Sequence, residues 1–547
     1  MPTTRLAKHG WKLIFLAIAA FYLFGLGALP LVGPDEPRYA EVAREMFARH
    51  DLITPTLGGL PWFEKPALLY WLMMASYRVL GVNEYAARLG PAICGLVTAI
   101  FVFWLGKIVA QTRSTPGREN ASHLGQWSAL VFLSSFGAIA FSRAASFDIV
   151  LTMTLTGALC CFFVWQIANA NGQNKPSVLA AFYFFVGLSL LAKGLVGIVL
   201  PAGIILVYFA LRREWPKKSF FLSLLWGLPM ALIVAAAWYG PMLYRHGWIF
   251  IDQFIVQHHF KRFLSNKYHH PQPFYFYIPT ILWLAGPWTL LFVAGFVSSV
   301  RTWHQSNERR TLAYLTLAWV MVPLLFFSLS EAKLPGYILP VLPAVAMLAG
   351  NEVPRILRLD RSSKLLQVTG VLFLAVALAG SWYMVRRLGL PTRPAILGLL
   401  VAAVAGGIVV LVSRRKTVAV FALAIASLCI IMIGIEGAKV VAAHDSVRDL
   451  IQAADARGYS SAPVFYFLCD DRSAEFYASG RLAYEATGEP VRFEGAQDVT
   501  AAIRQKGGLG LVLMETRWEK QLTDYRSVRA EKIADNGWIS IFAVHTN

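Results

Sequence analysis

Charged residues are scarce in this 547-residue chain. Asp, Glu, Lys and Arg make up 15% of it, against about 25% in an average soluble domain, whereas hydrophobic residues reach 57% and the mean hydropathy is +0.54. Apolar runs of about 18–25 residues recur between Trp11 and Lys439, and a helix needs runs of that length to cross a bilayer. The composition therefore excludes an ordinary soluble protein and predicts a polytopic α-helical membrane protein.

Cysteine is also rare, and the five cysteines form no spaced pattern. Only Cys469 lies outside the apolar runs; the others are Cys94, Cys160, Cys161 and Cys429. This distribution excludes a disulfide framework and a CxxC metal site. A glycine-rich phosphate loop of the nucleotide type is missing as well, so we expect neither a nucleotide cofactor nor a nucleotide-activated donor.

A cleavable signal peptide is not expected. The first apolar run, Leu13 to Val32, is longer than the apolar core of a signal peptide, and no small-residue cleavage site follows it. We therefore interpret this run as the first permanent span.

The net charge of +19 resides in the apolar part of the chain. Residues 445–547 contain 15 acidic and 12 basic residues, so the basic excess lies in the loops between apolar runs. That placement is the positive-inside pattern of membrane proteins rather than a nucleic-acid-binding surface. It predicts about thirteen spans, a cytoplasmic N-terminus and an external C-terminal domain. The external loop from Arg386 to Arg393 breaks the pattern.

After Lys439 the long apolar runs give way to a mixed polar and apolar sequence, which predicts two domains. Residues 1–440 are predicted to form the transmembrane domain, and residues 441–547 a small external α/β domain. Its expected strands are Val464–Leu468, Leu509–Met514 and Trp538–Val544. Its expected helices are Val447–Ala456, Ser473–Ala478 and a segment near Val499–Lys506.

A short amphipathic helix is predicted directly after the first span. Asp35 is placed to cap its backbone N–H groups, and Pro37 suits its first turn. Helical spacing puts Tyr39, Val42, Ala43, Met46 and Phe47 on one face, with Arg38, Glu41, Arg44 and Glu45 opposite. Such a helix is typical of the bilayer surface, and Pro66–Leu80 is predicted to be a second interfacial helix.

Charges converge on the external face of the predicted topology. They fall at Asp35–Glu36, at Glu64–Lys65, at Arg143 with Asp148, at Lys193, in a histidine-rich loop with Arg262, and at Lys333 near Tyr337. Charges at the membrane edge are costly and indicate function. Each also has a bland interpretation: Asp35 as a helix cap, Arg143–Asp148 as a structural ion pair, and Lys193 as a snorkelling side chain.

Together these charges suit transfer to or from a lipid phosphate. The cations, which are Lys65, Arg143, Lys193, Arg262 and Lys333, can hold phosphate oxygens by charge-assisted hydrogen bonds. Asp35 and Asp148 amid those cations would stay ionised, as a general base or as partners of a substrate amine. Glu64 with His259 or His270 is a weaker candidate for a divalent ion, either zinc or magnesium/manganese.

Several motifs resemble one known family. They are Asp35-Glu36-x-Arg38-Tyr39-Ala40-Glu41, Phe63-Glu64-Lys65-Pro66, Asp148, Lys193-Gly194, Lys333-Leu334-Pro335 with Tyr337, and the loop motif His259-x-x-Arg262-Phe263 with His270. In these motifs, roughly within residues 12–350, the chain resembles the GT-C polyprenyl-phosphate-sugar glycosyltransferases. Within that family it is most similar to the branch that transfers 4-amino-4-deoxy-L-arabinose to lipid A.

The resemblance implies an all-α, GT-C-type membrane protein of the bacterial inner membrane, with a periplasmic C-terminal domain. It implies a sugar donor linked to undecaprenyl phosphate, a phosphate of lipid A as acceptor, and resistance to cationic antimicrobial peptides. Asp35 and Asp148 are then the catalytic candidates, and Glu64, His259 and His270 the metal candidates. The substrate-binding candidates are Glu36, Arg38, Lys65, Arg143, Lys193, Arg262, Lys333 and Tyr337.

Three alternatives remain open. A related transferase would move another sugar, such as mannose or galacturonic acid, to a lipid, a glycan or a protein. A transporter or lipid flippase would favour internal repeats and charges near the middle of the bilayer, and neither is evident. In a scaffold, the same charges would only form ion pairs.

Overall fold

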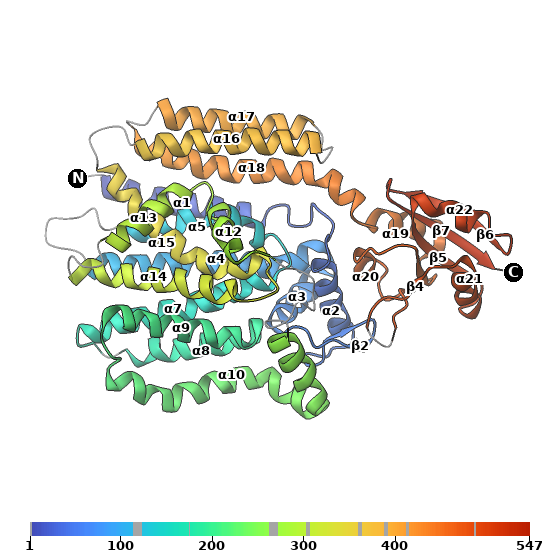
Figure 1. Ribbon diagram of the computed structural model, residues 1–547, viewed down its shortest axis with the longest axis horizontal. Helices are drawn as coiled ribbons and strands as arrows, with labels where there is room; N and C mark the ends of the chain where they lie inside the picture. The colour runs from blue at the N-terminus through green and yellow to red at the C-terminus, as the bar shows by residue number, and fades with distance from the viewer. Residues whose placement is uncertain are drawn as a thin grey trace. The chain divides into compact units, whose positions relative to one another are not determined.

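The computed structural model describes residues 3–112, 123–173, 175–261, 272–301, 307–358, 364–387, 392–411, 415–485 and 488–546. The chain divides into two compact units (Figure 1). The first unit contains Met1–Phe24, Phe63–Leu69 and Leu89–Gly434. The second contains Gly25–Trp62, Tyr70–Arg88 and Ile435–Asn547. This grouping differs from a single boundary near residue 440, because it joins the first external segments to the C-terminal residues.

Helices, most of them apolar, make up the first unit. In chain order they are α1 (Thr3–Leu23), α4 (Glu84–Thr112), α5 (Leu124–Leu133), α6 (Phe136–Ser142), α7 (Phe147–Ala170), α8 (Pro176–Lys193), α9 (Val196–Arg212), α10 (Lys218–Phe250), η2 (Ile251–Lys261), η3 (Phe274–Phe276), α12 (Tyr277–Leu284), α13 (Thr289–Arg301), α14 (Asn307–Ser328), η5 (Pro335–Val341), α15 (Leu342–Leu357), α16 (Lys364–Arg387), α17 (Thr392–Leu411) and α18 (Lys416–His444). The helix that begins at Glu84 and the helix that ends at His444 extend into the second unit. Figure 1 shows α7, α8 and α9 running side by side, and likewise α16 and α17.

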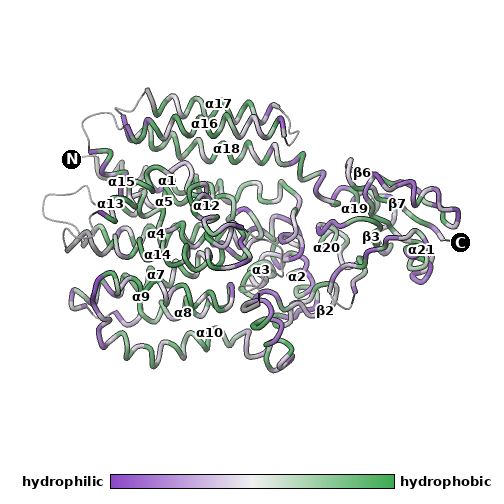
Figure 2. The backbone as a smooth tube through the Cα atoms, viewed as in Figure 1, coloured by the Kyte–Doolittle hydropathy of each residue, from purple (hydrophilic) through white to green (hydrophobic). Residues whose placement is uncertain are grey.

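The hydropathy of these helices makes the chain a multi-pass membrane protein. Among the described residues, eight helices are long and apolar enough to cross a membrane, or ten if each of two bent pairs is one span. Hydrophobic residues continue along α16 and α17, and polar residues gather near helix ends (Figure 2). Several further apolar helices are shorter than a full span. The count of about thirteen spans therefore stays a prediction.

The first helix ends earlier than the sequence predicts. The apolar run reaches Val32, but α1 stops at Leu23 and residues 24–35 form turns and irregular structure. Gly25 adopts a φ of +66°, a left-handed conformation that ends the helix, and Pro30 cannot supply the backbone N–H that a continuing helix needs. The predicted end of the first span at Val32 is wrong for this reason.

The second unit begins with two helices and a small hairpin. These are α2 (Glu36–Ala48), the strands β1 (Thr56–Leu57) and β2 (Leu60–Pro61), and α3 (Leu68–Leu80), which crosses the unit boundary. Both helices lie where the sequence predicts helices. Two details of α2 differ from the prediction. Asp35 stands at the N-cap position without a capping hydrogen bond from its side chain, and Glu41 is buried rather than on the exposed face.

A five-stranded mixed sheet forms the rest of the second unit. Its strands are β3 (Val464–Phe467), β4 (Arg492–Phe493), β5 (Leu509–Glu515), β6 (Val528–Asp535) and β7 (Ile539–Thr546), in the order β4-β3-β5-β7-β6. β3 is parallel to β4 and β5, and β7 is antiparallel to β5 and β6. The remaining elements are α19 (Arg448–Ala454), η6 (Asp455–Tyr459), α20 (Ser473–Tyr477), α21 (Ala496–Gln505), η7 (Thr516–Trp518) and α22 (Glu519–Thr523).

Alternating side chains build a core on each face of this sheet. Tyr466 and Leu513 belong to one buried cluster, and Phe465 and Val512 to the other, as the two-residue period of a strand requires. The predicted strands and helices of this domain are confirmed. The sequence does not predict β6, because half of the residues of this edge strand are charged and it lacks an apolar run.

Candidate active site

Three helix junctions of the first unit meet around one ion pair. Asp148 lies in the first turn of α7, where the hydroxyl of Ser146 accepts its backbone N–H at 3.1 Å and caps the helix. Lys193 is the last residue of α8 and donates to the Asp148 carboxylate. The helix can end there because Gly194 takes a φ of +69°. The side chains of Lys193 and Asp148 are 14% and 17% exposed, so the pair is largely shielded from water.

The segment after α14 closes over this pair. A Cβ atom on Gly336 would lie 2.0 Å from Oδ2 of Asp148, so only glycine permits the carboxylate to approach the η5 backbone. The next residue, Tyr337, places its ring 4.4 Å from Nζ of Lys193, which is a cation–π contact. Lys193 is therefore held between a carboxylate and an aromatic face.

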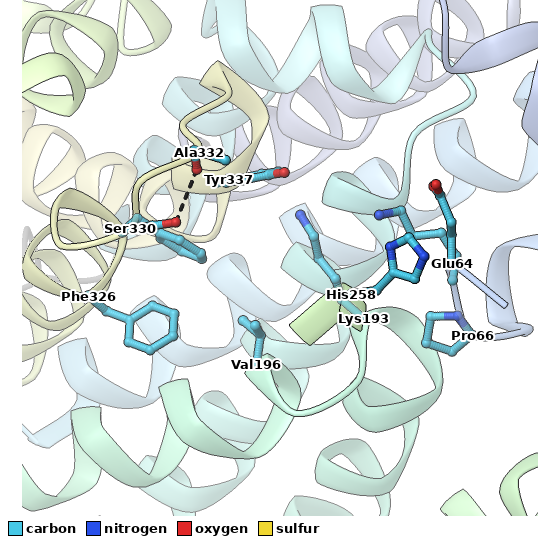
Figure 3. Close-up of a pocket in the computed structure, with 11 residues that line it drawn as sticks. Glu64, Pro66, Lys193, Val196, His258, Phe326, Ser330, Ala332 and Tyr337 are labelled. Carbon is cyan, nitrogen blue, oxygen red and sulfur yellow. Dashed lines mark hydrogen bonds between the residues drawn. The ribbon is translucent and has the colours of Figure 1, made fainter. Parts of the chain in front are cut away.

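A pocket of about 100 Å³ opens beside Lys193 (Figure 3). Its polar lining comes from Glu64, Lys65, Lys193, His258, Ser330 and Tyr337, and its apolar lining from Pro66, Val196, Phe326, Phe327 and Ala332. Four chain segments far apart in sequence thus contribute to one cavity. Two ammonium groups at a cavity with an aromatic and aliphatic wall suit a ligand that carries both a phosphate and an apolar chain.

Two of the predicted cations are engaged by backbone carbonyls. Nζ of Lys333, which is 7% exposed, donates to the carbonyl of Ser330 at 2.6 Å. Arg143 donates to the carbonyls of Phe21 at 2.9 Å and Phe24 at 2.8 Å, where it bonds the C-terminal end of α1. Lys193 donates to Asp148, and this ion pair was not predicted from the sequence.

The remaining acidic candidates lie in the second unit. Asp35 accepts a hydrogen bond from the Tyr39 hydroxyl at 3.2 Å. Glu36 forms a 2.7 Å ion pair with Arg88, which is 4% exposed, so Glu36 is not merely a solvated charge. Arg38 lies 5.4 Å from the centroid of the Trp62 ring. These residues share one helix start, as the sequence predicts.

The described residues include only part of the histidine-rich loop. Arg262 and His270 lie outside the described residues, and so does the side chain of His259. His258, at the end of η2, lines the pocket together with Glu64. Within the described part of the chain, no three His, Cys, Asp or Glu residues form a group able to hold a metal ion. The divalent ion therefore stays a prediction.

Sequence reasoning missed most of the pocket wall. Val196, Phe326 and Phe327 lie within apolar helices, where their aromatic or aliphatic character matches that of every neighbour. Ser330 is close to the Lys333 motif, but a single serine that belongs to no motif does not indicate a site. His258 stands one position before the histidine that the sequence favoured.

Known proteins share this fold. A solved structure of ArnT from Cupriavidus metallidurans bound to undecaprenyl phosphate matches with a TM-score of 0.79 and 23% identity, and covers 98% of both chains. The apo form of that ArnT matches with a TM-score of 0.77. The chain therefore has the same fold as this ArnT, the GT-C fold. Residues 13–251 also match the family described as dolichyl-phosphate-mannose-protein mannosyltransferase.

The curated relatives of this chain carry one description. They are named undecaprenyl phosphate-alpha-4-amino-4-deoxy-L-arabinose arabinosyl transferase. The relative from Edwardsiella ictaluri is 28% identical over 68% of this chain and 64% of its own length. The relative from Sodalis glossinidius, whose name ends in 2, is 32% identical over 66% of this chain and 62% of its own. The matched region thus spans less than two thirds of these relatives.

Proposed function

We propose that this chain transfers 4-amino-4-deoxy-L-arabinose from undecaprenyl phosphate to a phosphate group of lipid A. The proposed place of the reaction is the periplasmic face of the bacterial inner membrane, with the N-terminus cytoplasmic and the C-terminal domain periplasmic. Modified lipid A would confer resistance to cationic antimicrobial peptides. The names of the relatives and the ArnT fold support the substrates.

The pocket around Lys193 is the observation that carries the proposal. Lys193 and Lys65 offer ammonium groups to phosphate oxygens, and the aromatic wall of Phe326 and Phe327 suits the first units of a polyprenyl chain. During transfer, the bond between the anomeric carbon and the donor phosphate breaks, and the polyprenyl phosphate leaves with additional negative charge. Cations that are already in place stabilise this charge without reorganisation.

The carboxylates take the remaining roles. An acceptor phosphate monoester has a second pKa of about 6, so it is largely ionised at neutral pH and needs little help to attack the anomeric carbon. We assign Asp35 to orienting the acceptor or taking its residual proton. Asp148, beside Lys193, keeps that ammonium group directed at the pocket and offers a partner to the amine of the sugar.

A divalent ion remains part of the proposal. Such ions take three or more nitrogen or oxygen ligands, and Glu64 and His258 supply one of each kind at the pocket. His259 and His270 are the further candidate ligands. The purified wild-type protein should then carry about one metal equivalent by elemental analysis, and Glu64→Gln should reduce this content. Equal metal content in both would argue against the assignment.

Reconstitution tests the function directly. The purified chain is incubated with lipid A and undecaprenyl phosphate-linked aminoarabinose, and lipid A is then analysed by mass spectrometry. We expect lipid A that carries one or two added pentosamines, formed roughly 10²- to 10³-fold more slowly by Lys193→Met. A panel of mannose- and galacturonate-linked polyprenyl phosphates distinguishes the alternative transferases. Lipid A that gains no sugar from any donor, with the added lipids merely redistributed across vesicle leaflets, would instead favour a flippase.

A further inference from the structure

The hydroxyl of Tyr477 joins three segments of the second unit. Tyr477 is the last residue of α20, in the C-terminal domain. Its hydroxyl accepts a hydrogen bond from the backbone N–H of Leu31 at 2.8 Å and donates one to Oε1 of Glu84 at 3.0 Å. Leu31 lies in the irregular segment that leads to Asp35, and Glu84 opens α4. One hydroxyl therefore bridges residues that are 446 and 393 positions away in sequence.

Arg88 bonds the backbone carbonyls of the same segment. Nη1 of Arg88 donates to the carbonyls of Leu26 and Leu29, and Nη2 donates to the carbonyl of Pro30 at 2.8 Å. Its remaining donors form a bidentate contact with Glu36, at 3.0 and 2.7 Å. All five N–H donors of the guanidinium group are thus satisfied. The buried position of Arg88 makes these contacts hard for water to replace.

Side-chain hydrogen bonds from Arg88 and Tyr477 stabilise residues 26–35 in place of regular secondary structure. Residues 26–35 form no regular element of their own, yet Leu26 and Leu31 are fully or almost fully buried. Buried backbone groups need hydrogen-bond partners. Here a side chain of α4 satisfies the carbonyls and a side chain of α20 satisfies an N–H group. The conformation of the segment that precedes Asp35 and Glu36 therefore depends on the C-terminal domain.

We propose that Tyr477 is a positioning residue through which the C-terminal domain holds residues 26–36, and with them Asp35, in the geometry that transfer requires. This inference rests on the proposed function, because it presumes that the start of α2 takes part in the reaction. It gives the C-terminal domain a role in turnover in addition to any role in folding. Tyr477 touches no reacting atom in this scheme and acts only through the Leu31 backbone.

Tyr477→Phe is the decisive variant, since it keeps the half-buried ring and removes only the hydroxyl. We expect kcat to fall roughly 5- to 10-fold, as the loss of one hydrogen bond predicts, with KM for the donor unchanged within about twofold. Amide hydrogen exchange at Leu31 should accelerate. Tyr459→Phe is the matched control, because Tyr459 is also half-buried in this domain and its hydroxyl bonds neither Leu31 nor Glu84.

Two variants of Glu84 test the same contact if Tyr477→Phe fails to fold. Glu84→Gln keeps an acceptor oxygen for the Tyr477 hydroxyl and should retain near-wild-type kcat. Glu84→Ala removes the acceptor and should resemble Tyr477→Phe in kcat and in the exchange at Leu31. If Glu84 acted only through the charge of its 3.5 Å ion pair with Arg448, Glu84→Gln would lose as much kcat as Glu84→Ala.

Either of two results would overturn the inference: unchanged Leu31 exchange in Tyr477→Phe, or faster exchange with wild-type kcat. The exchange measurement needs no substrate. If the wild-type chain proves inactive with the aminoarabinose donor, the proposed function fails. The exchange comparison, together with kcat for whichever donor the wild type uses, then decides the role of Tyr477 separately.

Discussion

Lys193 and Asp148 form an ion pair that joins the last residue of α8 to the first turn of α7. The two residues are 45 positions apart, and neither belongs to a motif that names the other as its partner. Lys193 lines the pocket, and the Tyr337 ring covers its ammonium group. Substitution of Lys193 and Asp148 can therefore separate what the ion pair contributes to stability from what it contributes to catalysis.

A double-mutant cycle separates these contributions. Lys193→Met should lower turnover by roughly 10²- to 10³-fold, because it removes positive charge where the leaving phosphate becomes more negative. It should also lower Tm, because Asp148 is left largely buried without a counter-charge. Adding Asp148→Asn should restore Tm but not turnover.

Lys175→Met is the control for the cycle. Lys175 is exposed at the opposite end of α8, and its substitution should leave Tm and turnover near wild type. If the Lys193→Met/Asp148→Asn double variant regained turnover together with Tm, the pair would be purely structural.

Asp35→Asn tests the carboxylate at the start of α2. The side chain of Asp35 makes no capping bond, and an asparagine oxygen can still accept from Tyr39, so α2 should persist. Turnover should fall by roughly 10²–10⁴-fold, or less where the acceptor is already ionised. The loss should be greatest below pH of about 6, where the acceptor phosphate retains its proton. Turnover equal to wild type across pH 5–8 would leave Asp148 as the only catalytic candidate.

Gly336→Ala tests the close approach of η5 to Asp148. The added Cβ would collide with the carboxylate, so we expect a loss of about 1–3 kcal/mol in the free energy of unfolding and a marked fall in turnover. Gly434→Ala is the matched control, since Gly434 lies in a helix and no atom stands within 4 Å of the place that an added methyl group would occupy. It should be neutral or slightly stabilising. A Gly336→Ala protein that behaves like Gly434→Ala would show that the carboxylate is free to move.

Glu41 should make stability depend on pH. Burial raises the pKa of Glu41 to about 7, although Arg44, which bonds both carboxylate oxygens at 2.6 and 2.5 Å, lowers it; Glu45 and Glu475 add to the rise. The folded protein therefore binds this proton more tightly than the unfolded chain. The resulting stabilisation is complete below the ordinary glutamate pKa of about 4.5 and is lost as the pH rises through about 7.

Glu41→Gln should remove that dependence, because a neutral amide does not titrate. Thermal unfolding between pH 4.5 and 8 should show a smaller decline in Tm for the variant than for wild type. Glu494→Gln, an exposed glutamate in the same unit, should retain the wild-type slope. A wild-type Tm that rises over this interval would mean that the Arg44 contact outweighs burial.

Local patterns in the sequence were enough for the class of the molecule. Long apolar runs predict membrane helices, because the bilayer sets their length. Short apolar runs predict β3, β5 and β7, because both faces of each strand are buried. Basic loops imply a topology that brings Glu64, Lys65, Asp148, Lys193 and the 330–337 segment to one place. The pocket lining and the Lys193–Asp148 pair confirm that these segments meet.

Only the tertiary structure decided which residue bonds which. The sequence suggests Arg143 as a partner of Asp148 and does not suggest Lys193, whereas in the structure Lys193 donates to Asp148 and Arg143 donates to carbonyls at the end of α1. Tertiary packing also buries Glu41, pairs Glu36 with Arg88, and brings Tyr477 to Leu31. Hydropathy and helical periodicity depend on residues that are close together in the sequence, so the sequence alone reveals them. Partners that lie tens or hundreds of positions apart are chosen by the distances and burial that exist only after the helices and the C-terminal domain have packed.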